Sequence, residues 1–177
     1  MRKYAIQDFT NKDDYLQFIS YMLKESDSFS FVYVRYTYQD KLSNTCRKVK
    51  AALKKFKMFS YDIYKSSKRD KKQRYDDPHI YRLIMYKSEP EAIDGFAQAD
   101  SLFAWGDSKY PRDLAFYKND YAWFLIHSAS HYAVLYTDDD RNVEDLKRIG
   151  ADIEYIEDID DFCAEYDEVS KKKIFPF

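Results

Sequence analysis

The chain has 177 residues, of which 45% are apolar, 34% charged and 19% aromatic, a composition typical of a globular domain with a hydrophobic core. Its three glycines are isolated, which excludes a phosphate-binding loop and a dinucleotide fingerprint, so we expect no nucleotide cofactor. The net charge is only −2, and two distant cysteines without a Cys-x-x-Cys pair argue against a disulfide scaffold and a thiolate zinc site.

The N-terminal part of the chain predicts a strand, a helix and a second strand. Residues 3–9 are strand-like, and Thr10 stands at an N-cap position before a helix that extends to about residue 24. Apolar side chains recur at helical spacing in this helix: Tyr15, Phe18, Ile19, Met22 and Leu23. Residues 28–38 are rich in β-branched and aromatic side chains, which favours a long strand.

Residues 43–57 predict a basic amphipathic helix. Its apolar stripe consists of Cys46, Val49, Ala52, Leu53 and Phe56, and the opposite side carries Arg47, Lys50, Lys54 and Lys57. A short strand is expected at residues 59–64. Residues 65–78 contain a single apolar side chain, Tyr75, so we expect a basic, flexible loop there.

A further strand is predicted at residues 79–87. Pro90 and Glu91 then favour a helix start, with Ile93, Phe96 and Ala97 as its buried stripe. Residues 102–105 predict a short strand.

Residues 113–137 predict a C-terminal β-meander of three strands. Asn119 and Asp120 suit a tight two-residue turn between the first two. Alternation in the middle strand predicts that Ala122, Phe124 and Ile126 point to one face, and that Tyr121, Trp123 and Leu125 point to the other. Because both faces are apolar, we expect each of them to be covered.

The remaining residues predict a helix beginning near Asp138 and stopped by Gly150, a short strand at 153–156, and a last acidic helix from Ile159 to Tyr166. Strand and helix patterns alternate over the whole length of the chain. We therefore expect an α+β fold in which residues 1–177 form a single compact domain, with a mainly antiparallel sheet covered by amphipathic helices.

The small net charge conceals a division along the chain. Residues 1–75 carry 18 basic and 8 acidic residues, and residues 76–177 carry 11 basic and 23 acidic residues. Positive charge concentrates at residues 40–74 and negative charge at 138–168. The two regions either serve separate partners, pair with each other within the fold, or are simply solvated surfaces.

The basic region is the candidate binding site for an anionic partner. Its expected contact residues are Arg47, Lys50, Lys54, Lys57, Lys68, Arg69, Lys71, Lys72 and Arg74. Nearby tyrosines would allow stacking on nucleic-acid bases, although no recognised nucleic-acid module fits.

Catalytic and metal sites find little support in the sequence. His127 and His131 flank a turn that could bring their rings close, with His79 as a third candidate ligand, but their spacing is not one that aligns metal ligands. Neither Cys46 nor Cys163 belongs to a nucleophile signature, and Cys46 fits the apolar stripe of a helix. We therefore assign no catalytic, cofactor-binding or metal-binding residues.

These patterns favour a small soluble cytoplasmic protein without enzymatic activity that binds another protein in a regulatory or inhibitory role. Aromatic side chains and polarised charge are the positive grounds, since aromatic residues anchor many interfaces. Nucleic-acid binding through residues 40–74 is the first alternative, and an enzyme of unrecognised class is the second. No membrane span is predicted, and the composition suits a low-GC bacterium or a phage.

Overall fold

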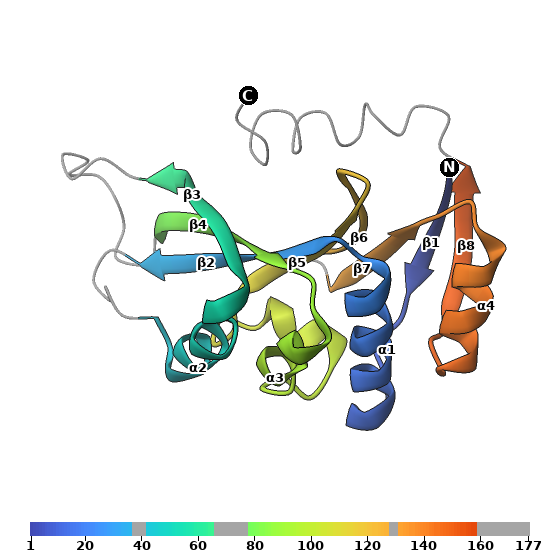
Figure 1. Ribbon diagram of the computed structural model, residues 1–177, viewed down its shortest axis with the longest axis horizontal. Helices are drawn as coiled ribbons and strands as arrows, with labels where there is room; N and C mark the ends of the chain where they lie inside the picture. The colour runs from blue at the N-terminus through green and yellow to red at the C-terminus, as the bar shows by residue number, and fades with distance from the viewer. Residues whose placement is uncertain (37–41, 66–77, 128–130, 159–177) are drawn as a thin grey trace.

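The computed structural model describes residues 1–36, 42–65, 78–127 and 131–158 (Figure 1). Eight strands form one sheet in the order β3-β4-β2-β5-β6-β7-β1-β8, and every neighbouring pair is antiparallel. The strands are β1 (Arg2–Ile6), β2 (Ser28–Tyr36), β3 (Lys57–Lys65), β4 (Pro78–Lys87), β5 (Arg112–Lys118), β6 (Tyr121–His127), β7 (Tyr132–Tyr136) and β8 (Ile153–Asp158).

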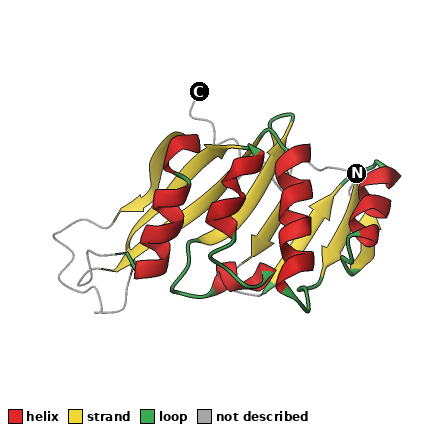
Figure 2. Ribbon diagram, turned by 60° about the horizontal axis from the view of Figure 1, so that its bottom comes forward, coloured by secondary structure: helices red, strands yellow, loops and turns green. Residues whose placement is uncertain are grey.

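All four α-helices lie on one face of this sheet (Figure 2). They are α1 (Lys12–Glu25), α2 (Asn44–Ala52), α3 (Ile93–Phe96) and α4 (Asp140–Arg148). Three 3₁₀ helices accompany them: η1 (Lys54–Phe56), η2 (Pro90–Ala92) and η3 (Leu102–Gly106). The predicted α+β class with an antiparallel sheet agrees with this architecture. The expected loop at 65–78 and the expected last helix lie largely outside the described residues.

Local sequence signals explain where the helices and turns form. The side chain of Asn11 caps α1 by accepting from the backbone N–H of Asp14, so the cap is one residue later than predicted. Asp139 caps α4 in the same way, and Gly150 follows that helix with a φ of 94°. Asn119 and Asp120, with φ of 50° and 66°, form the expected tight turn between β5 and β6.

The core between helices and sheet is built mainly from aromatic rings. Tyr86 stacks on Phe29, their ring centroids 5.2 Å apart, and Phe31 lies 4.7 Å from Trp105. The predicted stripe of α1 is confirmed, because all five of its apolar residues are buried. α3 approaches α2 closely at Gly95, where a β-carbon would lie 2.5 Å from Cδ2 of Leu53.

A second cluster of buried side chains lies on the other face of the sheet. It consists of Val32, Leu83, Met85, Ala115, Tyr117, Ala122, Val134 and Tyr136. Tyr117 hydrogen-bonds Ser30 within this layer at 3.0 Å, whereas the hydroxyl of Tyr61 is buried and has no hydrogen-bond partner among the described residues. No helix of the described ranges lies on this face.

Three local predictions were wrong. Trp123 lies in the helix-side core together with Phe124, while Ala122 faces the opposite layer. The cause is a β-bulge: Phe116 pairs with Phe124 and Tyr117 pairs with Ala122, so Trp123 is an extra residue that has no partner in β5. Residues 102–105 belong to η3 rather than to a strand. The basic helix is also shorter than expected, since α2 ends at Ala52 and η1 turns the chain into β3 at Lys57.

Candidate binding surface

Six cations gather where α2, η1 and the start of β3 meet, at one end of the sheet. We call them the basic surface: Arg47, Lys48, Lys50, Lys54, Lys55 and Lys57. The amphipathic pattern of α2 and η1 places them there, because Cys46, Val49, Leu53 and Phe56 are buried against the core. Ser43 caps α2 through the backbone N–H of Cys46.

Most of these cations have no anionic partner. Arg47, Lys48, Lys54 and Lys57 are exposed and make no ion pair with any part of the chain that the structure describes. The ammonium of Lys55 lies 4.7 Å from the ring centroid of Phe56. Binding of an anion by Arg47, Lys48, Lys54 and Lys57 would therefore break no ion pair between described residues.

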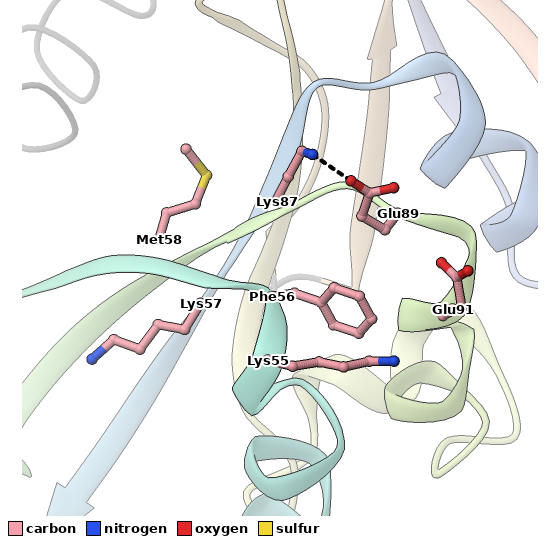
Figure 3. A pocket seen from close by; sticks show the side chains of 7 residues that line it. All are labelled: Lys55, Phe56, Lys57, Met58, Lys87, Glu89 and Glu91. Atoms are coloured by element: carbon pink, nitrogen blue, oxygen red, sulfur yellow. Dashed lines mark ion pairs between the residues drawn. The ribbon is translucent and has the colours of Figure 1, made fainter.

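A shallow hollow of about 470 Å³ adjoins the basic surface (Figure 3). It is lined by Lys55, Phe56, Lys57, Met58, Lys87, Glu89 and Glu91. Figure 3 shows Lys55 reaching past the Phe56 ring in the direction of Glu91, whereas Lys57 and Met58 point the other way. Charges of both signs and an apolar side chain therefore meet at this site.

Two features of the hollow were not predicted from the sequence, namely the exposure of Met58 and the presence of two glutamates. Met58 is 55% exposed, an unusual position for a large apolar side chain. Glu89 and Glu91 lie more than thirty residues further along the chain and reach the site because β4 pairs with β3. Glu89 binds Lys87 at 2.5 Å, and this contact raises the pKa of the lysine. The position of Met58 directly after three lysines and Phe56 can be seen in the local sequence, whereas the pairing of β3 with β4 cannot.

A second hollow of about 470 Å³ lies near the loops at the other side of the helical layer. It is lined by Asp8, Ser101, Phe103, Ala104, Asp107 and His131. Both carboxylates are engaged locally, because Asp8 accepts from the backbone N–H groups of Phe9 and Leu102, and Asp107 accepts from that of Lys109. The hydrogen bond from the Lys109 backbone holds the pKa of Asp107 below its ordinary value. The carboxylates of Asp8 and Asp107 therefore hold backbone N–H groups of nearby loops.

The described histidines lie apart from each other. The ring of His131 stacks on Phe103 on the helix side, whereas His127 stacks on Tyr132, which packs against the helix-free layer. The side chain of His79 lies outside the described part. In the described ranges, no group of three His, Cys, Asp or Glu residues has an arrangement that could hold a metal ion.

Cys46 is part of the core. Its thiol is buried and donates to the backbone carbonyl of Lys109 at 3.4 Å. Burial raises the pKa of this thiol, which disfavours the nucleophilic thiolate. Cys163 belongs to the residues that are not described.

The acidic region lies at the opposite end of the sheet from the basic surface. α4 and β8 carry its described residues, and β8 is the edge strand furthest from β3. Seven strand spacings of about 4.8 Å separate the two edges by about 34 Å, several times the Debye length of about 8 Å at physiological salt. For residues 138–158, pairing with the basic surface within one molecule is therefore ruled out.

The remaining predicted contact residues cannot be placed. Lys68, Arg69, Lys71, Lys72 and Arg74 lie outside the described residues. Of the nine predicted cations, the structure brings together Arg47, Lys50, Lys54 and Lys57, beside Lys48 and Lys55 of the same basic segment.

The chain matches no known protein family, no curated protein and no solved structure. In the described residues, no helix has the length and apolar character needed to cross a membrane.

Proposed function

We propose that this protein binds a partner protein through the basic surface and its adjoining hollow, in a regulatory or inhibitory role. One observation carries the proposal: four exposed cations that form no ion pair with the described residues lie beside a hollow that displays Met58. The expected partner segment is acidic and contains at least one apolar side chain.

Electrostatics supports binding at this end of the molecule. Asp62, the acidic residue of β3, is bound by Arg82 at 2.6 Å, so it does not neutralise the lysines of the basic surface. The acidic end of the molecule is about 34 Å away, which is too far to screen them. An uncompensated patch of one sign accelerates the encounter with an oppositely charged surface.

The hollow favours a protein over a nucleic acid. Glu89 and Glu91 would repel the evenly spaced phosphates of a polyanion, whereas a protein can place its own cations against them. Met58 offers apolar contact, and Phe56, with an exposed fraction of 9%, presents little ring surface for a stacked base.

Nucleic-acid binding is the second candidate, and the spacing of cations supports it. Arg47, Lys50 and Lys54 follow one another at helical intervals over α2 and η1, and Lys57 follows at the start of β3, so that this row of cations could track a phosphate backbone. Such binding would weaken steeply with salt, by about 10³-fold or more between about 50 and 200 mM for six phosphate contacts.

Compartment is a further part of the proposal. The chain has only two cysteines, and Cys46 is a buried free thiol, which is compatible with a reducing environment. We propose that the protein acts in the cytoplasm, as the composition already indicated.

Matched charge reversals test the proposal. K54E/K57E removes two cations of the basic surface, and K24E/K147E makes the same change in net charge at exposed lysines elsewhere. Proteins captured from a cell extract should bind K54E/K57E at least about ten-fold more weakly than the wild type, and should bind K24E/K147E unchanged. Equal retention on both variants would contradict the proposal.

Titration with DNA and RNA oligonucleotides at about 50 mM salt separates the two candidates. Binding that is lost in K54E/K57E would favour nucleic acid as the ligand. No binding by the intact protein would remove that candidate.

A further inference from the structure

The two edges of the sheet share an unusual feature. Among the described residues, the exposed large apolar side chains are Met58, Tyr155 and Ile156, with exposed fractions of 55%, 51% and 38%. All three lie on the edge strands, Met58 on β3 and the other two on β8. Exposed apolar side chains on an unpaired strand edge are typical of sites where another strand docks.

The two edges carry opposite charge. Lys57 begins β3, and Lys54 and Lys55 lie in η1 directly before it. Glu154, Glu157 and Asp158 lie on β8, and all six side chains are exposed. Glu157 is bound by Lys3 at 3.3 Å, but no ion pair engages Glu154 or Asp158 within the described ranges. Like edges therefore repel each other, and unlike edges attract.

Strand direction is compatible with the same contact. Because eight strands alternate in direction across the sheet, β3 and β8 run in opposite directions. Consider a second copy that is translated across the sheet, perpendicular to the strands, without rotation. Its β3 would lie antiparallel beside β8 of the first copy, and the helices of both copies would lie on the same face.

We propose that copies of this chain associate head to tail, with the β3 edge of one copy against the β8 edge of the next. Such a contact is heterologous and does not close on itself, so it builds chains rather than a symmetric dimer. The charges disfavour pairing of two β3 edges or of two β8 edges, because like charges would then face each other.

Irregular edges limit the strength of this association. The register shifts next to Met58 in β3 and next to Ile156 in β8, so a continuous hydrogen-bonded ladder between copies is interrupted. Side-chain contacts and charge must supply most of the attraction. The association should therefore be weak and should decrease with salt.

Charge exchange between the two edges provides the test. K54E/K57E makes both edges acidic, and E154K/D158K makes both edges basic. In sedimentation velocity at about 20 mM salt, the wild type should sediment faster as its concentration increases, and it should return to the monomer value at about 500 mM. Each variant alone should stay monomeric, whereas an equimolar mixture should associate again, because every contact in it joins unlike edges.

Controls make each outcome decisive. D13K/D94K changes the charge as E154K/D158K does, but at exposed positions in α1 and α3, outside both edge strands, and it should associate like the wild type. Thermal unfolding of each variant confirms that it is folded. A wild type that is monomeric at low salt would overturn the inference, and so would association that persists in both edge variants.

This inference is independent of the proposed partner, although Lys54 and Lys57 serve both contacts. E154K/D158K distinguishes the two, because it should abolish self-association and leave partner capture unchanged. If partner capture fails while the mixture of edge variants still associates, the proposed function fails and the edge contact stands.

Discussion

At the scale of single residues, Phe124 reports on the aromatic core. Its ring is fully buried and lies 5.3 Å from Phe18 and 6.1 Å from Phe116, measured between ring centroids. Phe124→Ala removes these contacts and leaves a cavity, so the free energy of unfolding should fall by about 3–5 kcal/mol in urea denaturation.

Met58→Ala is the matched control on an exposed side chain, and it should change the free energy of unfolding by less than about 0.5 kcal/mol. An unchanged midpoint for Phe124→Ala would be inconsistent with this core.

Buried tyrosine pairs make the stability sensitive to alkaline pH. The hydroxyls of Tyr33 and Tyr86 hydrogen-bond at 3.0 Å inside the core. Burial raises the pKa of Tyr86 to about 12 and raises that of Tyr33 well above its ordinary value. The folded state therefore keeps these protons when the unfolded chain loses them. Stability is complete below a pH of about 10, the unfolded pKa, and decreases as the pH rises toward about 12.

Y33F/Y86F tests this dependence. Because both hydroxyls of the pair are removed together, the stability near pH 7 should change little. Between about pH 9 and pH 11 the unfolding free energy of the variant should decrease less than that of the wild type, as measured by urea denaturation at each pH. Identical pH profiles would show that this pair does not contribute.

At the scale of elements, the contact between α3 and α2 sets the position of the basic surface. Gly95 has no side chain, and a β-carbon there would lie 2.5 Å from Cδ2 of the buried Leu53. Gly95→Ala should therefore overpack this contact and lower the unfolding free energy by about 1–3 kcal/mol.

A double-mutant cycle with Leu53→Ala identifies the cause. Shortening Leu53 makes room for the new methyl group, so Gly95→Ala should cost less in that background than in the wild type, as measured by urea denaturation of all four proteins. Additive effects would instead show that the cost does not come from this contact.

At the scale of the whole molecule, the distance between the basic surface and the acidic end means that the lysines do not stabilise the fold by pairing with that end. Its cations repel one another, and the acidic end is about 34 Å away. K54E/K57E should therefore leave the unfolding free energy unchanged within about 0.5 kcal/mol or increase it slightly at low salt, because it relieves this repulsion. A loss above about 1 kcal/mol in urea denaturation would mean that these lysines have a structural role.

The sequence alone determined the elements whose signals are local. The period of α1, the caps and Gly150 around α4, and the Asn119–Asp120 turn depend on neighbours a few residues away, so their pattern is sufficient. The charged side of α2 was identified for the same reason.

Tertiary structure decided everything that depends on pairing between distant strands. The strand order places β3 and β8 at opposite edges and so separates the charges, which sequence position does not reveal. Pairing of β3 with β4 brings Glu89 and Glu91 to the basic surface, and one register shift turns Trp123 toward the helices. The physical reason is that strand pairing and register are set by contacts along the whole sheet, whereas the side-chain alternation of a single strand is compatible with many registers.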